Sequence, residues 1–175
     1  MHLNLKTLGI FAAFVATIPV ANWTLDHFGF VRVPGLGMVA SGVVWAGLAF
    51  VLRDIAQLLT NKWATLIAIG IGVGLSYVLA DPFIATASAA AFGLSEALDW
   101  AIYSPLAQRR FLLAVILSSF VGALADSALF LQIAFHSTDG WWQLAVVKSA
   151  VIALAVPFAW KARRDLSVRL NPEIS

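Results

Sequence analysis

The chain has 175 residues, of which 61% are hydrophobic and only 11% are charged, and its net charge is +2. Soluble domains carry roughly 25% charged residues, so this composition excludes an ordinary water-soluble domain and indicates an integral membrane protein. Six transmembrane helices of about 20 residues each would use most of the chain. They would leave no room for a soluble catalytic or ATP-hydrolysing module. The sequence contains no cysteine, which excludes disulfides, thiol catalysis and thiolate metal sites.

Apolar segments predict a single all-α transmembrane domain over residues 1–175. In chain order, the predicted membrane spans are Thr7–Trp23, Gly35–Arg53, Ala64–Ala80, Phe83–Tyr103, Phe111–Ile133 and Trp141–Trp160. Several Trp residues fall at the ends of these spans, as in the aromatic belts of membrane proteins. In the third span, Gly70 and Gly74 form a G-x-x-x-G pair, which predicts close packing against another helix.

The basic residues predict the orientation of the chain in the membrane. One side holds nine of the eleven Lys and Arg residues: Lys6, Arg53, Lys62, Arg109, Arg110, Lys161, Arg163, Arg164 and Arg169. The other side holds only Arg32, and Lys148 falls inside the sixth span. Cytoplasmic loops carry the excess of Lys and Arg, so both termini are expected in the cytoplasm. The same distribution explains the basic residues without nucleic-acid binding.

The fourth span carries a polar face whose exposure to lipid would be energetically unfavourable. At 100° per residue, Ser88, Phe92, Glu96 and Asp99 fall on one side of this helix. An ionised side chain at mid-bilayer costs roughly 2.5–3.5 kcal/mol on insertion scales. This face is therefore expected to point toward protein or a water-filled cavity.

The other ionisable groups in the spans each allow two interpretations. Asp126 and Lys148 are expected at similar depth, where they form a structural salt bridge or contribute to a binding site. Asp54 beside Arg53 forms an interfacial ion pair or part of a gate. No intramembrane cation is assigned to the two carboxylates of the fourth span, which are either solvated or protonated helix-end groups or substrate ligands.

A cavity lined by carboxylates, hydroxyls, a lysine and aromatic rings (Phe92 and Trp45) suits a flat, polar and mostly neutral molecule. A carboxylate can accept two parallel hydrogen bonds from a guanine-type edge, and aromatic rings can stack on its face. The same carboxylates could instead relay protons. Residue types alone do not choose between these uses.

Two segments resemble the queuosine precursor transporter family, also called the vitamin uptake transporter family. They read IATASAAAFGLSEALDWAIYSPL and SSFVGALADSALFLQIAF, and LAFVLRDIAQ resembles the family's region after its second span. The likeness covers about Trp45 to Trp160. The chain departs from the family pattern at Leu58 and Asn61, where an acidic residue and a glycine are common.

This resemblance implies a six-helix fold similar to the substrate-binding components of energy-coupling-factor (ECF) vitamin transporters. It also implies secondary-type uptake of 7-deazaguanine queuosine precursors, such as preQ0 and preQ1, across a bacterial inner membrane. The positions carried over from the resemblance are Asn22, Asp54, Ser88, Glu96, Asp99, Asp126 and Lys148. With Phe92 added from the polar face of the fourth span, the expected substrate-binding residues are Asn22, Ser88, Phe92, Glu96, Asp99, Asp126 and Lys148, and Arg53 and Asp54 are expected as gating or interfacial residues. No enzymatic activity, cofactor or metal is expected, and proton coupling and oligomeric state are left open.

The alternative function is a vitamin- or nucleobase-binding subunit that needs a separate energising complex. Ala12 and Ala16 have an A-x-x-x-A spacing that resembles the coupling motif of such subunits, although small-residue pairs are common in membrane helices. A membrane-embedded enzyme is disfavoured, because no His or Cys lies in a predicted span and no H-E-x-x-H pattern occurs.

Overall fold

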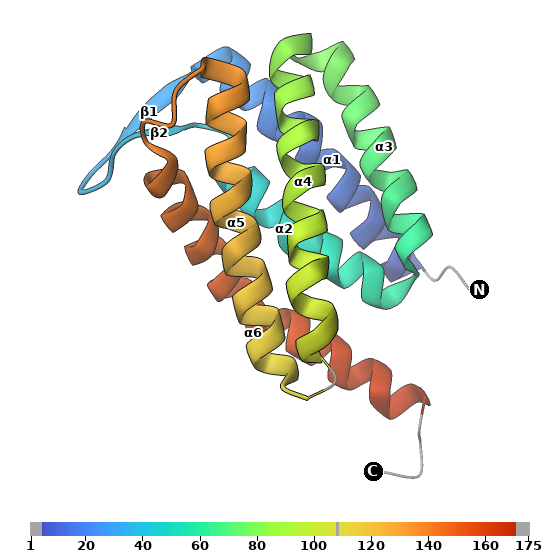
Figure 1. Cartoon of the computed structure of the whole chain (residues 1–175). Helices are drawn as coiled ribbons and strands as arrows, with labels where there is room; N and C mark the ends of the chain where they lie inside the picture. Colours follow the sequence, from blue (N-terminus) through green and yellow to red (C-terminus); the bar gives the residue numbers. More distant parts are fainter. Residues whose placement is uncertain (1–4, 108, 171–175) are drawn as a thin grey trace.

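The computed structural model describes residues 5–107 and 109–170, which form a mostly helical protein with one β-hairpin (Figure 1). The elements are α1 (Leu5–Phe28), β1 (Phe30–Val33), β2 (Gly37–Ala40), α2 (Val43–Leu59), α3 (Lys62–Leu79), α4 (Pro82–Ala107), α5 (Phe111–Phe135) and α6 (Trp141–Leu170). Among the described residues, three stretches are long and apolar enough to cross a membrane, namely Thr7–Phe28, Lys62–Leu79 and Ile116–Phe135. The predicted all-α membrane class is confirmed to this extent.

The helices turn at two ends of the molecule. The hairpin, the α3–α4 turn and the α5–α6 turn lie at one end, named here the hairpin end (Figure 1). The α2–α3 and α4–α5 turns lie at the opposite end, where α1 begins and α6 ends. The antiparallel neighbours α4 and α5 make the most extensive helix pairing, and α2 packs against α1 and α6.

The hairpin corrects the predicted start of the second helix. That helix was expected from Gly35, but Phe30 pairs with Ala40 and Val33 with Gly37 in two antiparallel strands. Gly35 and Gly37 adopt φ values of 80° and 89°, a left-handed region that glycine occupies without steric cost. The Pro-Gly-Leu-Gly sequence at the tip therefore forms a turn, and α2 begins only at Val43.

Polar side chains fix two short helix connections. The Asn61 side chain accepts a hydrogen bond from the Ala64 amide at 2.9 Å and caps α3. The Asp81 carboxylate accepts from the amides of Phe83 and Ile84 at 2.9 and 3.1 Å, at the start of α4. Asn61 is one of the positions that departs from the family pattern, and capping gives it a structural role.

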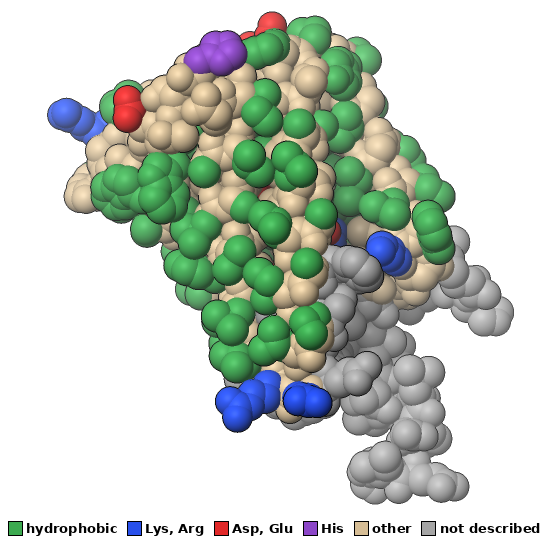
Figure 2. Space-filling view, viewed as in Figure 1, with side chains coloured by type: hydrophobic (Ala, Val, Ile, Leu, Met, Phe, Trp, Pro, Cys, Tyr) green, Lys and Arg blue, Asp and Glu red, His purple; other side chains and the backbone are tan. Residues whose placement is uncertain are grey.

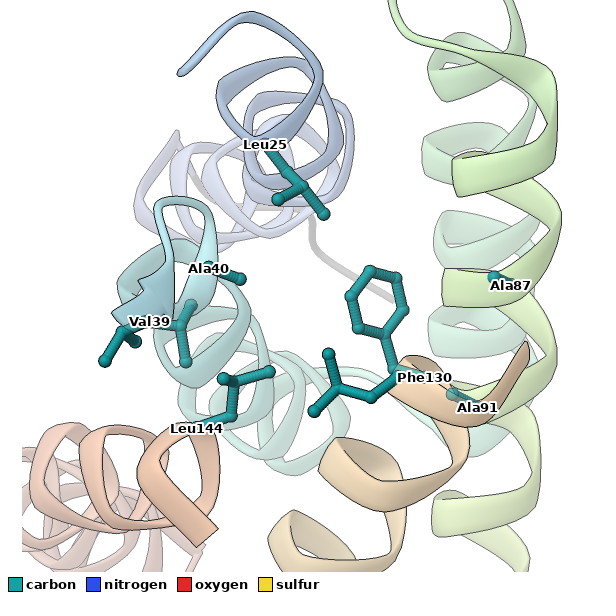
Figure 3. Close-up of a cluster of buried hydrophobic side chains, with 9 residues drawn as sticks. Leu25, Val39, Ala40, Ala87, Ala91, Phe130 and Leu144 are labelled. Atoms are coloured by element: carbon teal, nitrogen blue, oxygen red, sulfur yellow. The ribbon is translucent and has the colours of Figure 1, made fainter. Parts of the chain in front are cut away.

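Two apolar clusters fill the bundle. The larger lies near the hairpin end and includes Leu25, Phe130 and Leu144, which point toward one another in Figure 3. The smaller contains Phe14, Ala49, Ala56 and Ala68. On the outer surface, hydrophobic side chains cover the visible sides of α4 and α5, while most of the visible Lys and Arg lie toward the opposite end (Figure 2). Such an apolar outer surface is suited to lipid rather than to water.

Glycines allow helices to approach closely, but the G-x-x-x-G pair predicted for such a contact does not make it. A Cβ at Gly42 would lie 2.1 Å from the Ala21 carbonyl oxygen, and a Cβ at Gly72 would lie 2.6 Å from the Ile18 side chain. Nothing lies within 4 Å of a Cβ at Gly70 or at the glycine four residues later. The G-x-x-x-G pair therefore lies on the outer face of α3, and Gly72 makes the close contact instead.

The close approach at Gly42 generates a stability prediction. We expect Gly42→Ala to lower the free energy of unfolding by about 1–3 kcal/mol, the usual cost of overpacking, because the added methyl collides with backbone. The matched control is Gly70→Ala, whose methyl meets open space in a helix. Thermal unfolding in detergent measures both, and equal melting temperatures for the two variants would contradict the prediction.

Candidate functional site

A cavity lies within the bundle, and all six helices contribute to its wall. Its volume of about 60 Å³ exceeds the roughly 10–15 Å³ that one water molecule needs, so it holds several waters or a small ligand that displaces them. The wall is mostly apolar, with a few polar side chains: Thr17, Asn22, Ser88, Asp126 and Lys148. Few polar groups in an apolar wall are typical of small-molecule sites.

A buried ion pair joins α5 and α6 at this cavity. Lys148 donates a hydrogen bond to the Asp126 carboxylate, and the two residues are only 2% and 6% exposed. The sequence analysis placed both groups at similar depth, and the contact between them is confirmed. Because both residues also line the cavity, the pair can hold the helices together and present charge to a ligand.

A hydrogen-bond chain orients the Asn22 amide. Its Nδ2 donates to the Ser76 Oγ at 3.0 Å, and that hydroxyl donates to the Gly72 carbonyl oxygen at 3.0 Å. A serine hydroxyl has one hydrogen, so Ser76 can only accept from Asn22. The amide therefore turns its NH₂ group toward α3 and leaves its oxygen for another partner. Ser76 was not among the predicted residues, and its only signal was a hydroxyl within an apolar span.

Two aromatic rings meet at one side of the cavity. Phe50 of α2 and Phe92 of α4 both line it, with ring centroids 5.1 Å apart and an interplanar angle of 47°. Phe92 was a predicted site residue, whereas Phe50 was missed because nothing in the sequence distinguishes it from a core phenylalanine. Trp45, the other predicted aromatic residue, is 40% exposed and does not line the cavity.

A second group of charges lies outside the cavity, around Arg53. Its Nη1 lies 2.8 Å from the Asp54 carboxylate, and its Nη2 lies 3.6 Å from the Asp99 carboxylate and donates to the Glu96 carboxylate. Arg53 is only 6% exposed. The two α4 carboxylates were left without a cation in the sequence-based interpretation, which is wrong because Arg53 pairs with both. The expected ion pair between Arg53 and Asp54 is confirmed.

The predicted site residues therefore form two groups. The cavity brings together Asn22, Ser88, Phe92, Asp126 and Lys148. The second group, named here the arginine cluster, consists of Arg53, Asp54, Glu96 and Asp99, none of which lines the cavity. The two aromatic rings lie at the junction, since Phe50 is one helical turn before Arg53 and Phe92 is one turn before Glu96.

Residues 7–160 match the family described as "Putative vitamin uptake transporter". The chain belongs to the vitamin uptake transporter family. Neither the curated proteins nor the solved structures include a significant match to it. Family membership and the apolar helices together make the chain a membrane transport protein.

Within residues 5–107 and 109–170, no group of three or more His, Asp or Glu side chains could hold a metal ion. The cavity wall offers a ligand the ion pair, the Asn22 amide, the hydroxyls of Thr17 and Ser88, and the aromatic rings.

The buried ion pair generates a second stability prediction. We expect Lys148→Met to lower the free energy of unfolding by about 3–5 kcal/mol, because the Asp126 carboxylate is left buried without its partner. Adding Asp126→Leu should recover much of this loss, since no unpaired charge remains. Denaturation in detergent measures the free energy of unfolding of the single and the double variant, with the exposed Arg32→Gln as the control. A double variant as unstable as Lys148→Met would contradict the prediction.

Proposed function

We propose that this chain is a secondary-type transporter that imports queuosine precursors, 7-deazaguanine bases such as preQ0 and preQ1. The observation that carries the proposal is the apolar cavity between the helices, in whose wall a carboxylate, a lysine and an amide lie with an aromatic ring. The resemblance of the α4 and α5 segments to the queuosine precursor family supports the choice of substrate. The vitamin uptake family supports the direction of transport, which is uptake.

The cavity offers complementary groups for such a base. Asp126 is the carboxylate that lines it, and its acceptor sites exceed those used by Lys148. It can accept from the ring N–H and the exocyclic amine of a guanine-type edge, while the lysine can donate to a carbonyl oxygen. Phe92 can stack on the base, and Asn22 offers its amide oxygen. Glu96 lies one turn beyond Phe92, on the way to the opposite end.

The arrangement supports an inward direction from the hairpin end to the opposite end. Lys62, Arg109 and Arg110 are exposed at the opposite end, whereas Arg32 is exposed on the hairpin. By the positive-inside rule, the opposite end faces the cytoplasm of a bacterial inner membrane. The remaining predicted basic residues lie outside the described side chains: Lys6, Lys161, Arg163, Arg164 and Arg169.

Six membrane spans and two cytoplasmic termini complete this proposal. The shortest helix, α2, has 17 residues, which rise about 26 Å at 1.5 Å per residue. This is close to the hydrocarbon thickness of about 30 Å, and the hairpin joins its outer end. A six-helix bundle of this kind resembles the substrate-binding components of ECF transporters.

A second candidate function is a binding subunit that needs an energising partner complex. The observation that favours it is that Ala12 and Ala16 are both exposed on α1. Their A-x-x-x-A spacing then lies on the outer surface, where a partner helix could pack closely.

Uptake assays test the proposal and separate it from the alternative. We expect the chain expressed alone, in cells that lack their own carrier, to restore uptake of a labelled queuosine precursor. Guanine should compete with the precursor, because it presents the same hydrogen-bonding edge, and unrelated vitamins should not. Ala12→Leu with Ala16→Leu should leave this uptake unchanged.

Two outcomes would contradict the proposal. Tight precursor binding without uptake, or loss of uptake in the double leucine variant, would favour the partner-dependent subunit. Competition by an unrelated vitamin in place of guanine would exclude a 7-deazaguanine substrate.

The orientation of Asn22 generates a further prediction. Ser76→Ala removes the acceptor for the amide NH₂ group, and we expect the KM for uptake to rise two- to tenfold, the equivalent of a net hydrogen bond of about 0.5–1.5 kcal/mol. Ser127→Ala is the matched control, because Ser127 is equally buried and also donates to the carbonyl four residues earlier. A similar KM for both variants would show that Ser76 does not orient the amide.

A further inference from the structure

The junction between the cavity and the arginine cluster has two layers. The first is the ring contact between Phe50 and Phe92, whose centroids are 5.1 Å apart. One helical turn further from the cavity, Arg53 donates to the Glu96 carboxylate, which forms the second layer. Both layers join the same two helices, α2 and α4.

Side chains rather than close backbone packing connect α2 and α4 at the junction. The backbones of α2 and α4 approach each other closely at few positions, unlike those of α4 and α5. Phe50 is 5% exposed and Arg53 is 6% exposed, so both α2 side chains are buried, whereas the Glu96 and Asp99 side chains of α4 are 23% and 14% exposed. Two helices held by side chains can separate at this level without unpacking a continuous helix interface.

The backbone of α5 lies close to both layers at Gly122. An added Cβ there would lie 4.0 Å from the Phe50 ring and 3.8 Å from the Asp99 Cβ. Such distances are ordinary van der Waals contacts, so α5 packs against the junction at this position. The side chains that meet across the junction come from α2 and α4.

The aromatic layer and the ion-pair layer are expected to open together. A guanidinium and carboxylates in an apolar bundle stay paired because separation without water leaves each charge unsolvated. The aromatic rings lie between the cavity and the ions, so water in the cavity would have to pass them to reach the ion pairs. When the rings part, water can solvate the charges and the ion pairs can break, so the two layers should open together.

We propose that Phe50, Phe92, Arg53, Glu96 and Asp99 form a two-layer inner closure between the cavity and the cytoplasm. Substrate release then requires α2 and α4 to separate at this level. The proposal rests on the transport function only in taking the cavity as the substrate site. It gives the two α4 carboxylates a role in closing the path rather than in holding the base in the closed state.

Thiol labelling tests the closure without any substrate. The sequence has no cysteine, so Ala46→Cys places a single thiol in the cavity wall, one turn before Phe50. In inside-out vesicles, a membrane-impermeant maleimide should label this thiol slowly. Adding Phe92→Ala and Arg53→Gln together should raise the labelling rate at least tenfold, and either substitution alone should raise it less.

Two matched controls identify the cause of faster labelling. Phe130→Ala removes a phenylalanine from the cavity wall away from the closure, and Arg110→Gln removes an exposed arginine at the opposite end. Neither should accelerate labelling from the cytoplasmic side. Equally fast labelling in the Ala46→Cys parent, or equal acceleration by the controls, would overturn the proposal.

A second measurement keeps the proposal testable if Arg53→Gln does not insert into the membrane. With Arg53 retained, Glu96→Gln and Asp99→Asn combined with Phe92→Ala should raise the labelling rate of the Ala46→Cys thiol at least tenfold, because the same ion pairs are then lost from α4. An unchanged labelling rate in this variant would overturn the closure. If the labelling rates change as expected but the Ala46→Cys parent takes up no precursor, the result would contradict the proposed substrate and not the proposed closure.

Discussion

The need to pair buried charges organises this bundle. An unpaired ionised group in an apolar interior costs several kcal/mol, and two ion-paired groups meet that constraint at different levels. Lys148 and Asp126 join α6 to α5 at the cavity, while Arg53 joins α2 to the carboxylates of α4 beyond it. The first connection forms part of the cavity wall, and the second lies one helical turn beyond the aromatic rings of that wall.

The two groups of charges differ in what they can do. The pair at the cavity is accessible to a ligand, since both residues line the wall. The arginine cluster has three carboxylates around one guanidinium and lies behind two phenylalanine rings. In the function and closure proposed above, α4 would contribute to both recognition and the barrier with one stripe of side chains at four-residue intervals, from Ser88 through Phe92 to Glu96.

Much of the architecture follows from patterns in the sequence, and the errors share a cause. Apolar length predicts the helical class, and depth along each span predicts the contact between Asp126 and Lys148. The second span was placed too early because its apolar composition conceals a glycine turn. With α2 running from Val43 to Leu59, Arg53 is the eleventh of 17 residues instead of the last. Spacing likewise cannot tell which face of α3 meets a neighbour, so Gly72 was overlooked beside Gly70 and Gly74.

The missing side chain at Gly122 lets the backbone of α5 lie close to both groups of contacts between α2 and α4. A single methyl there would already reach van der Waals contact with Phe50 and Asp99. A larger side chain would have to displace the ring or the carboxylate, so this position limits how closely α5 can pack against the arginine cluster.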